Sequence, residues 1–427
     1  MKRRAGPLHH YHPPAPLHPR HHAAGKMASF GAGIVAGASD NDPTTVATLA
    51  VVGSTTIYEL GWLALLIIPM LAVIQAIAAQ IGAVSKRGLE DCVRAAYGRG
   101  WAIAALAALL IVNLLTLAAD LEGGGAALSL LTHVSYVWWL VPLGALTAVV
   151  LIFGKYAAIE RVLRYVALLF LAYVGAAFLA RPNWSAVLHD SFIPHFDFRP
   201  VVVSGALALL GTTLTAYAYV WETIEQSEEK PPVSRLGLVQ VDAVLGIVVA
   251  GLTFWFILVA TGATLGVHHK TVQTVEEAAQ ALAPIAGPYA KVVFAVGLLA
   301  SALVAIPVIA ATSAYVAAEM FGWRRSLDAK FARARAFYLT LTACIAISAA
   351  IGFAGVRPVT LLFYSGIAGG IATPFTMVLM LLVGRNPRLM KSHRISPWLA
   401  VGGWCVTAVV SGATLIYLVQ TVQGGAS

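Results

Sequence analysis

Long apolar runs separated by short polar segments occupy nearly the whole sequence. About eleven of these runs are long enough to cross the roughly 30 Å hydrocarbon layer of a membrane as α-helices. The pattern predicts an all-α polytopic membrane protein. We place the spans at residues 28–53, 59–84, 101–131, 136–154, 157–180, 200–226, 236–266, 288–320, 336–355, 358–384 and 396–420.

The first 26 residues contain no such run and are rich in proline and histidine. We expect a disordered cytoplasmic tail rather than a cleavable signal peptide, followed by a transmembrane domain over residues 27–427. The tail histidines are candidate metal ligands, although their spacing defines no coordination geometry. They are His9, His10, His12, His18, His21 and His22.

The basic residues are divided unequally between the two faces that eleven spans define. With a cytoplasmic N-terminus, only five of the 28 lysines and arginines face outward. These five are Arg181, Arg199, Lys270, Lys291 and Arg357. The positive-inside rule therefore predicts a cytoplasmic N-terminus in an inner membrane. The net charge of +9 follows from this asymmetry and indicates no nucleic-acid partner.

Composition excludes a soluble class, because 59% of the residues are hydrophobic and 11% are charged. Cys92, Cys344 and Cys405 lack a paired spacing, so we interpret them as packing residues rather than as a disulfide framework or a zinc motif. The glycine run 123–125 lies inside a span and not in a phosphate-binding loop. No catalytic pattern is found, and we expect neither an enzyme nor a bound cofactor.

The first span contains acidic residues in its middle, where a carboxylate costs roughly 2.5–3.5 kcal/mol to insert. Asp40, Asn41 and Asp42 precede Pro43, which lacks an amide hydrogen and disfavours helical backbone at the residue before it. Two half-helices joined by unwound chain are expected here. Carboxylates at such a break predict a cation site, with Asp42 and Asp40 as candidate ligands together with Thr45. Capping of the second half-helix by Asp42 is the alternative.

A second interruption is expected within residues 211–219 of the sixth span. Thr212, Thr213 and Thr215 stand there with Tyr217, where a lipid-facing helix would carry leucine and valine. Their hydroxyls can satisfy backbone groups that a break frees, or can ligate the ion, or can serve helix packing alone. Spans 1–5 (28–180) and 6–10 (200–384) would then form two inverted repeats, with the last span (396–420) as an addition.

Further ionisable residues lie inside the third and sixth spans. Asp120 and Glu122 precede the glycines 123–125, which allow close helix approach, and Glu222 stands near the inner end of the sixth span. With Tyr217, these residues are candidates for a proton path, because a buried carboxylate can carry a proton. An internal polar network is the alternative interpretation, and both stay open.

The order and spacing of several motifs resemble the NRAMP family of divalent-metal transporters. They are Asp42-Pro43, the Gln75–Gly82 run, Ala119–Gly123, Phe294–Ala302 and Pro374-Phe375 followed by Arg385–Met390. The resemblance covers the chain after the tail. It implies a LeuT-like fold of 5+5 inverted repeats with helices 1 and 6 broken, and a transporter that works by alternating access.

The site residues depart from the family pattern. The family's helix 1 asparagine corresponds to Thr45, and its helix 6 Met-Pro-His run corresponds to Thr215, Ala216 and Tyr217. A soft thioether is therefore replaced by hydroxyl oxygen. Oxygen ligands suit Mg²⁺, Ca²⁺ or Mn²⁺, and Mg²⁺ needs only one or two carboxylates. The sequence resembles a divergent branch of the family that looks like Mg²⁺ transporters.

We therefore expect a secondary transporter of a divalent cation, favouring a hard ion such as Mg²⁺ and next Mn²⁺. One alternative is a proton-coupled Mn²⁺/Fe²⁺ symporter, although loss of the helix 6 histidine weakens the case for coupling. Another is a divergent member that carries an organic solute or acts as a sensor. The expected partners are the metal ion, protons if transport is coupled, and the lipid bilayer.

Overall fold

The computed structural model describes residues 42–153, 168–229, 236–327 and 329–424, and these residues contain helices and no strands. Eight described segments are helical, long and apolar enough to cross a membrane, and two shorter apolar helices accompany them. The helices within the predicted spans are α2 (Pro43–Thr56), α3 (Gly61–Ser85), α5 (Arg99–Thr132), α6 (Val137–Phe153), α8 (Ala172–Leu179), α10 (Pro200–Thr213), α11 (Ala216–Glu229), α12 (Leu236–Thr264), α15 (Ala290–Phe321), α16 (Arg335–Gly352), α17 (Pro358–Arg385) and α19 (Pro397–Gly424).

Each of the eleven predicted apolar runs contains a described helix, and the sixth contains two, α10 and α11. The boundaries differ by a few residues, most at the C-terminal end of α19, which continues to Gly424. The predicted tail, the first half of the first span, and residues 154–167, which include the first part of the fifth span, lie outside the described residues.

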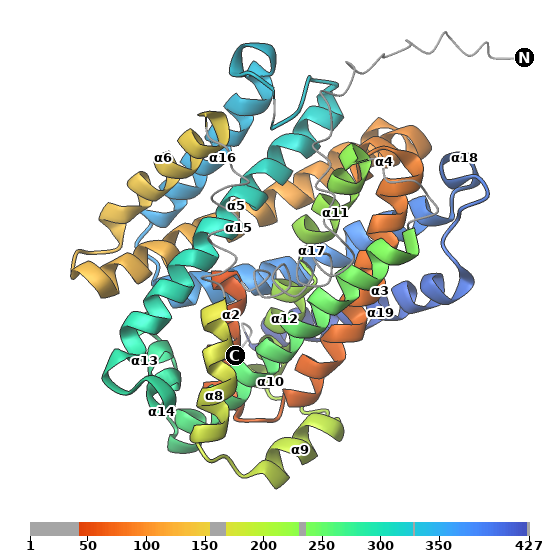
Figure 1. Ribbon diagram of the computed structural model, residues 1–427. Helices are drawn as coiled ribbons and strands as arrows, with labels where there is room; N and C mark the ends of the chain where they lie inside the picture. Colours follow the sequence, from red (N-terminus) through yellow and green to blue (C-terminus); the bar gives the residue numbers. More distant parts are fainter. Residues whose placement is uncertain (1–41, 154–167, 230–235, 328, 425–427) are drawn as a thin grey trace, which may run out of the picture.

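Short helices join the spans, and the apolar runs did not predict them. They are α4 (Leu89–Tyr97), α9 (Trp184–Phe192), α13 (Val275–Ala279), α14 (Ala283–Ala286) and α18 (Pro387–Met390). In Figure 1, α9, α13 and α14 lie at one end of the bundle, while α4 lies toward the opposite end. This arrangement agrees with the predicted alternation of outer and inner connections.

The core of the bundle is formed by long helices that are distant in sequence. α5 packs along α15, and Asn113 donates a hydrogen bond to Ser313 Oγ at 2.9 Å between them. α10 packs against α17 through glycine, because a Cβ added to Gly211 would collide with the backbone of Gly366 and Gly370. These contacts hold the middle of the molecule in place around α2.

The expected close approach at glycines 123–125 is confirmed. A Cβ on Gly123 would lie 2.9 Å from Pro43 Cβ, and one on Gly125 would lie 2.9 Å from the carbonyl oxygen of Tyr136. The small residues therefore let α5 approach both α2 and the start of α6. Cys92 and Cys344 are buried free thiols, as packing residues would be, whereas Cys405 is exposed.

Candidate ion-binding site

The α2 helix begins at the Asp42-Pro43 step, and Asp42 caps it. Asp42 has extended backbone (φ −70°, ψ 162°), and its Oδ1 accepts a hydrogen bond from the Thr45 amide at 2.6 Å. This bond satisfies an amide that has no partner inside the helix. Pro43 takes the first helical position, where its missing amide hydrogen costs nothing. Helical backbone therefore does not run through Asp42.

The second interruption separates α10 from α11 and confirms the break expected within residues 211–219. α10 ends at Thr213, α11 begins at Ala216, and Leu214 has φ −98° and ψ 27°. The last turn of a helix leaves carbonyl groups without intrahelical partners. Because this end of a helix carries partial negative charge, it is a favourable neighbour for a cation.

The two interruptions meet inside the protein. The Tyr217 hydroxyl, on the first turn of α11, donates a hydrogen bond to Asp42 Oδ2 at 2.8 Å. One turn further along α2, Thr45 Oγ1 lies 3.0 Å from Thr212 Oγ1 at the end of α10. Asp42 is 3% exposed, so its carboxylate is enclosed between the broken helices.

A second carboxylate joins this site through a residue that the sequence did not single out. Asp120 Oδ1 in α5 accepts hydrogen bonds from the Thr44 hydroxyl at 2.8 Å and the Thr44 amide at 3.3 Å. Asp120 Oδ2 is buried and has no hydrogen-bond partner among the described residues. The signal for Thr44 was its position after Asp-Pro, where the first amides of a helix need external acceptors.

The threonines of the second interruption differ in what their hydroxyls contact. Thr213 Oγ1 donates to the Leu209 carbonyl oxygen at 2.6 Å, within its own helix. Thr215 Oγ1, in the segment between the two helices, is buried and has no partner among the described residues. The Thr215 hydroxyl oxygen is therefore available to accept a bond or to ligate an ion, whereas the Thr213 hydroxyl already makes a hydrogen bond within its own helix.

The remaining predicted polar residues lie apart from Asp42 or outside the described chain. Glu122 is fully buried with both oxygens unpartnered in the described residues, and Gly352 of α16 passes beside its Oε1. Residues two apart point roughly 200° apart around an α-helix, so Glu122 faces away from Asp120. Glu222 is half-buried on α11, five residues beyond Tyr217. Asp40 lies outside the described residues.

The sequence profile of the natural resistance-associated macrophage protein-like family, Nramp, matches residues 33–420. The chain belongs to the Nramp family. Among relatives of this Nramp chain, the divalent metal cation transporter MntH of Deinococcus radiodurans is 29% identical over 93% of this chain and 90% of its own length. The protein of the same name from Bacillus subtilis is 23% identical over 93% of both chains.

Solved structures place the Nramp chain in its fold class. A crystal structure of a mutant Eremococcus coleocola manganese transporter matches with a TM-score of 0.69 and 18% identity, over 92% of this chain and 86% of that one. The transporter MhsT in complex with L-phenylalanine matches with a TM-score of 0.59 and 16% identity, over 93% of this chain and 98% of that one. The predicted all-α, LeuT-like fold of 5+5 inverted repeats is confirmed. Helix 6 is broken between α10 and α11, whereas for helix 1 the structure describes the half that begins at Pro43, and the preceding half lies outside the described residues.

Proposed function

We propose that this Nramp protein moves divalent metal cations across the membrane by alternating access and favours a hard ion such as Mg²⁺. The observation that supports it most directly is the Asp42 carboxylate, enclosed between two interrupted helices with Tyr217 and the Thr45–Thr212 pair around it. A buried carboxylate at membrane depth is costly and is typical of an ion pathway.

The chemistry of the surrounding groups supports the hard-ion preference. The side chains that hydrogen bonds place around Asp42 and across the two breaks all end in oxygen, and Thr215 adds an unpartnered hydroxyl. Carboxylate, hydroxyl and carbonyl oxygens suit Mg²⁺ and Mn²⁺ better than later transition metals. In this proposal Asp42 and Thr215 contact the ion or its waters, Thr45 and Thr212 support them, and Asp40 stays a candidate ligand from the sequence.

Proton-coupled Mn²⁺ or Fe²⁺ uptake is the second candidate. Relatives of the chain carry the name divalent metal cation transporter MntH, and the Eremococcus coleocola protein of similar fold is a manganese transporter. Asp120 gives this candidate a proton-carrying group, because its Oδ2 is buried without a partner in the described chain and Thr44 links it to the start of α2. The location in an inner membrane with a cytoplasmic N-terminus is part of either proposal and rests on the distribution of basic residues.

Flux measurements in proteoliposomes separate these candidates. Purified protein is tested with Mg²⁺ and Mn²⁺ outside, while trapped dyes report metal entry and internal pH. The proposal expects Mg²⁺ entry without acidification of the lumen. Mn²⁺ entry with acidification, and no Mg²⁺ entry, would favour the coupled symporter. No flux of either ion would favour the solute carrier or sensor.

The variant Asp42→Ala tests the site itself. It is expected to abolish metal flux while the protein keeps its elution profile and thermal stability. Glu276→Gln is the matched control. Glu276 is exposed on α13, so this variant also removes one carboxylate, but at a position away from the two breaks. An Asp42→Ala protein that transports like the parent would refute the assigned ligand.

A further inference from the structure

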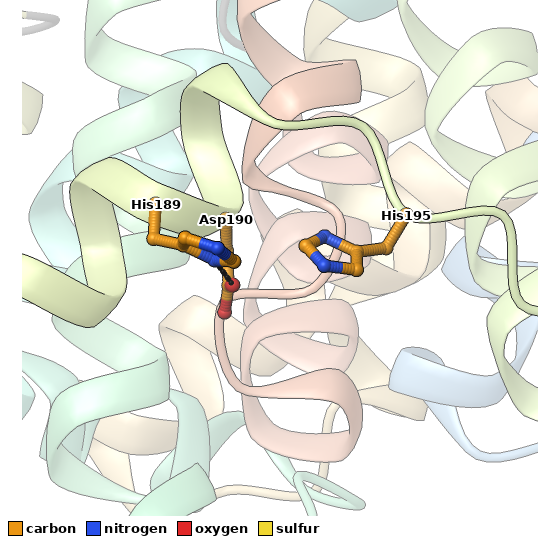
Figure 2. Close-up of side chains that lie close together, drawn as sticks. All are labelled: His189, Asp190 and His195. Atoms are coloured by element: carbon orange, nitrogen blue, oxygen red, sulfur yellow. Dashed lines mark hydrogen bonds and ion pairs between the residues drawn. The ribbon is translucent and has the colours of Figure 1, made fainter.

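A second group of potential metal ligands, separate from the residues at the two breaks, lies beside the end of α9. His189 and Asp190 stand in the last turn of α9, and His195 follows in the chain that leads to α10. One ligand atom from each of the three residues lies within 4.8 Å of the others. Figure 2 shows the Asp190 carboxylate between the two imidazole rings, joined to His189 by a hydrogen bond of 3.1 Å. Among the described residues, this is the one such group of three.

The α9 helix is anchored to the bundle, so two of the ligands have a fixed base. The buried Ser191 Oγ accepts a hydrogen bond from Trp255 Nε1 of α12 at 2.8 Å. A Cβ added to Gly61 at the start of α3 would lie 2.8 Å from the same oxygen, so α3 and α9 are in close contact. Asn183 caps the other end of α9. His189 and Asp190 are therefore presented by a helix that cannot shift freely.

The segment that carries His195 is also held in place. Its neighbour Phe196 packs edge-on against Trp62 of α3, with ring centroids 5.5 Å apart. The next residue, Asp197, pairs with Arg199, which also pairs with Glu59. These contacts follow His195 directly in the chain, and the His195 ring lies 5.2 Å from the His189 ring, centroid to centroid. Preorganisation of this kind is what a binding site requires.

The ligand types select a class of ion. Imidazole and carboxylate together suit Zn²⁺, Ni²⁺ or Cu²⁺, whereas Mg²⁺ prefers oxygen alone. Ligands of a tetrahedral Zn²⁺ stand about 2.0–2.2 Å from the metal, hence about 3.3 Å from one another. Both histidines are exposed, so side-chain rotation can close the present separation and leave a position for water. The C-terminal end of α9 adds partial negative charge that favours a cation.

We propose that His189, Asp190 and His195 bind one divalent transition-metal ion such as Zn²⁺, on the face predicted to be external. This site differs in chemistry from the oxygen-lined site at the two breaks, because two of its three ligands are imidazoles. It is peripheral to that site and does not depend on the proposed function, so each can fail without the other.

Zn²⁺-protected chemical modification tests this proposal on the unaltered full-length protein. Diethyl pyrocarbonate modifies exposed imidazoles, and mass spectrometry locates each modified histidine. Zn²⁺ is expected to slow the modification of His189 and His195 at least tenfold, while Mg²⁺ leaves the rate of modification unchanged. His268, which is also exposed, is the internal control and stays reactive. Protection confined to the tail histidines would overturn the proposal.

Calorimetry with Zn²⁺ gives an independent readout. Because the tail histidines are themselves candidate metal ligands, titrations use full-length protein in which those six are changed to glutamine. One Zn²⁺ per chain is expected, with affinity at least tenfold lower in His189→Ala and His195→Ala and unchanged in His268→Gln. Thermal unfolding without metal checks that these exposed substitutions leave the fold intact. Equal Zn²⁺ affinity in His189→Ala and the background protein would also overturn the assignment.

Discussion

The Tyr217 hydroxyl donates a hydrogen bond to Asp42 Oδ2 at 2.8 Å, and this bond joins the two interrupted helices at their facing ends. Asp42 Oδ1 is at the same time occupied by the Thr45 amide. Each carboxylate oxygen therefore accepts one bond from the protein and keeps a second lone pair directed elsewhere. The bond joins residues of two different helices, so the effect of removing it measures how much it contributes to holding α2 and α11 together.

Tyr217→Phe is expected to lower the free energy of unfolding by about 0.5–2 kcal/mol, the range for a buried hydrogen bond in a membrane protein. The phenyl ring fills the same space, so the loss reflects the hydroxyl alone. Thermal unfolding in detergent measures it, with the exposed Tyr364→Phe as control. Equal stability of the two variants would show that the bond contributes nothing.

Asp120→Asn separates capping from charge at the second carboxylate. The amide oxygen still accepts from Thr44, so we expect the free energy of unfolding to change by less than about 1 kcal/mol. The amide that replaces the unpartnered Oδ2 can neither ionise nor carry a proton, and metal flux is expected to fall at least tenfold. Flux in proteoliposomes and thermal unfolding are compared on the same preparation. Unchanged flux would restrict Asp120 to a capping role.

Gly211→Ala and Gly412→Ala are expected to have opposite effects on the free energy of unfolding. A Cβ at Gly211 collides with backbone of Gly366 and Gly370, which cannot move aside without separating α10 from α17. We expect a loss of about 3 kcal/mol or more, or failure to fold. Gly412 in α19 faces open space, where alanine is favourable in a helix by about 0.5–1 kcal/mol. Thermal unfolding of the two variants, relative to the parent, tests the contrast.

Stability at alkaline pH is expected to depend on Glu90 of α4, outside the spans. Burial raises the pKa of Glu90 well above its usual value, and the nearby Glu319 and Asp91 add to the shift. A raised folded-state pKa means that the neutral form stabilises the protein at acidic pH and that this contribution is lost as pH rises through that pKa. Glu90→Gln removes the dependence of stability on pH that arises from this carboxyl group. We expect it to raise the unfolding temperature at about pH 8 and to change it little at about pH 5.

The control for this comparison is Glu276→Gln, which alters an exposed carboxylate. It should leave the dependence of the unfolding temperature on pH unchanged. A Glu90→Gln protein with the same alkaline loss of stability as the parent would contradict the assignment to Glu90.

The spans, the start of α2 after Asp42 and the interruption between α10 and α11 were predictable because each depends on residues close in sequence. Apolar length specifies a membrane helix, Pro43 forbids helical continuation at Asp42, and a polar stretch at 211–219 replaces lipid-facing side chains. The placement of a carboxylate at the first interruption follows from the same local information. The short helices were missed, because an amphipathic segment such as α4 has no apolar run of its own.

Only the tertiary structure decided which side chains meet. Tyr217 reaches Asp42 and Thr44 reaches Asp120 because the glycines of α5 and α10 let helices approach closely. The group at His189 and His195 likewise exists because α3 and α12 hold α9 in place. The sequence alone predicts the apolar spans, the start of α2 at Pro43 and the interruption between α10 and α11, since those depend on hydrophobicity and local backbone sterics. Contacts between distant segments depend on how whole helices pack; the glycines 123–125 indicated that another helix could approach closely there, but not which helix it would be.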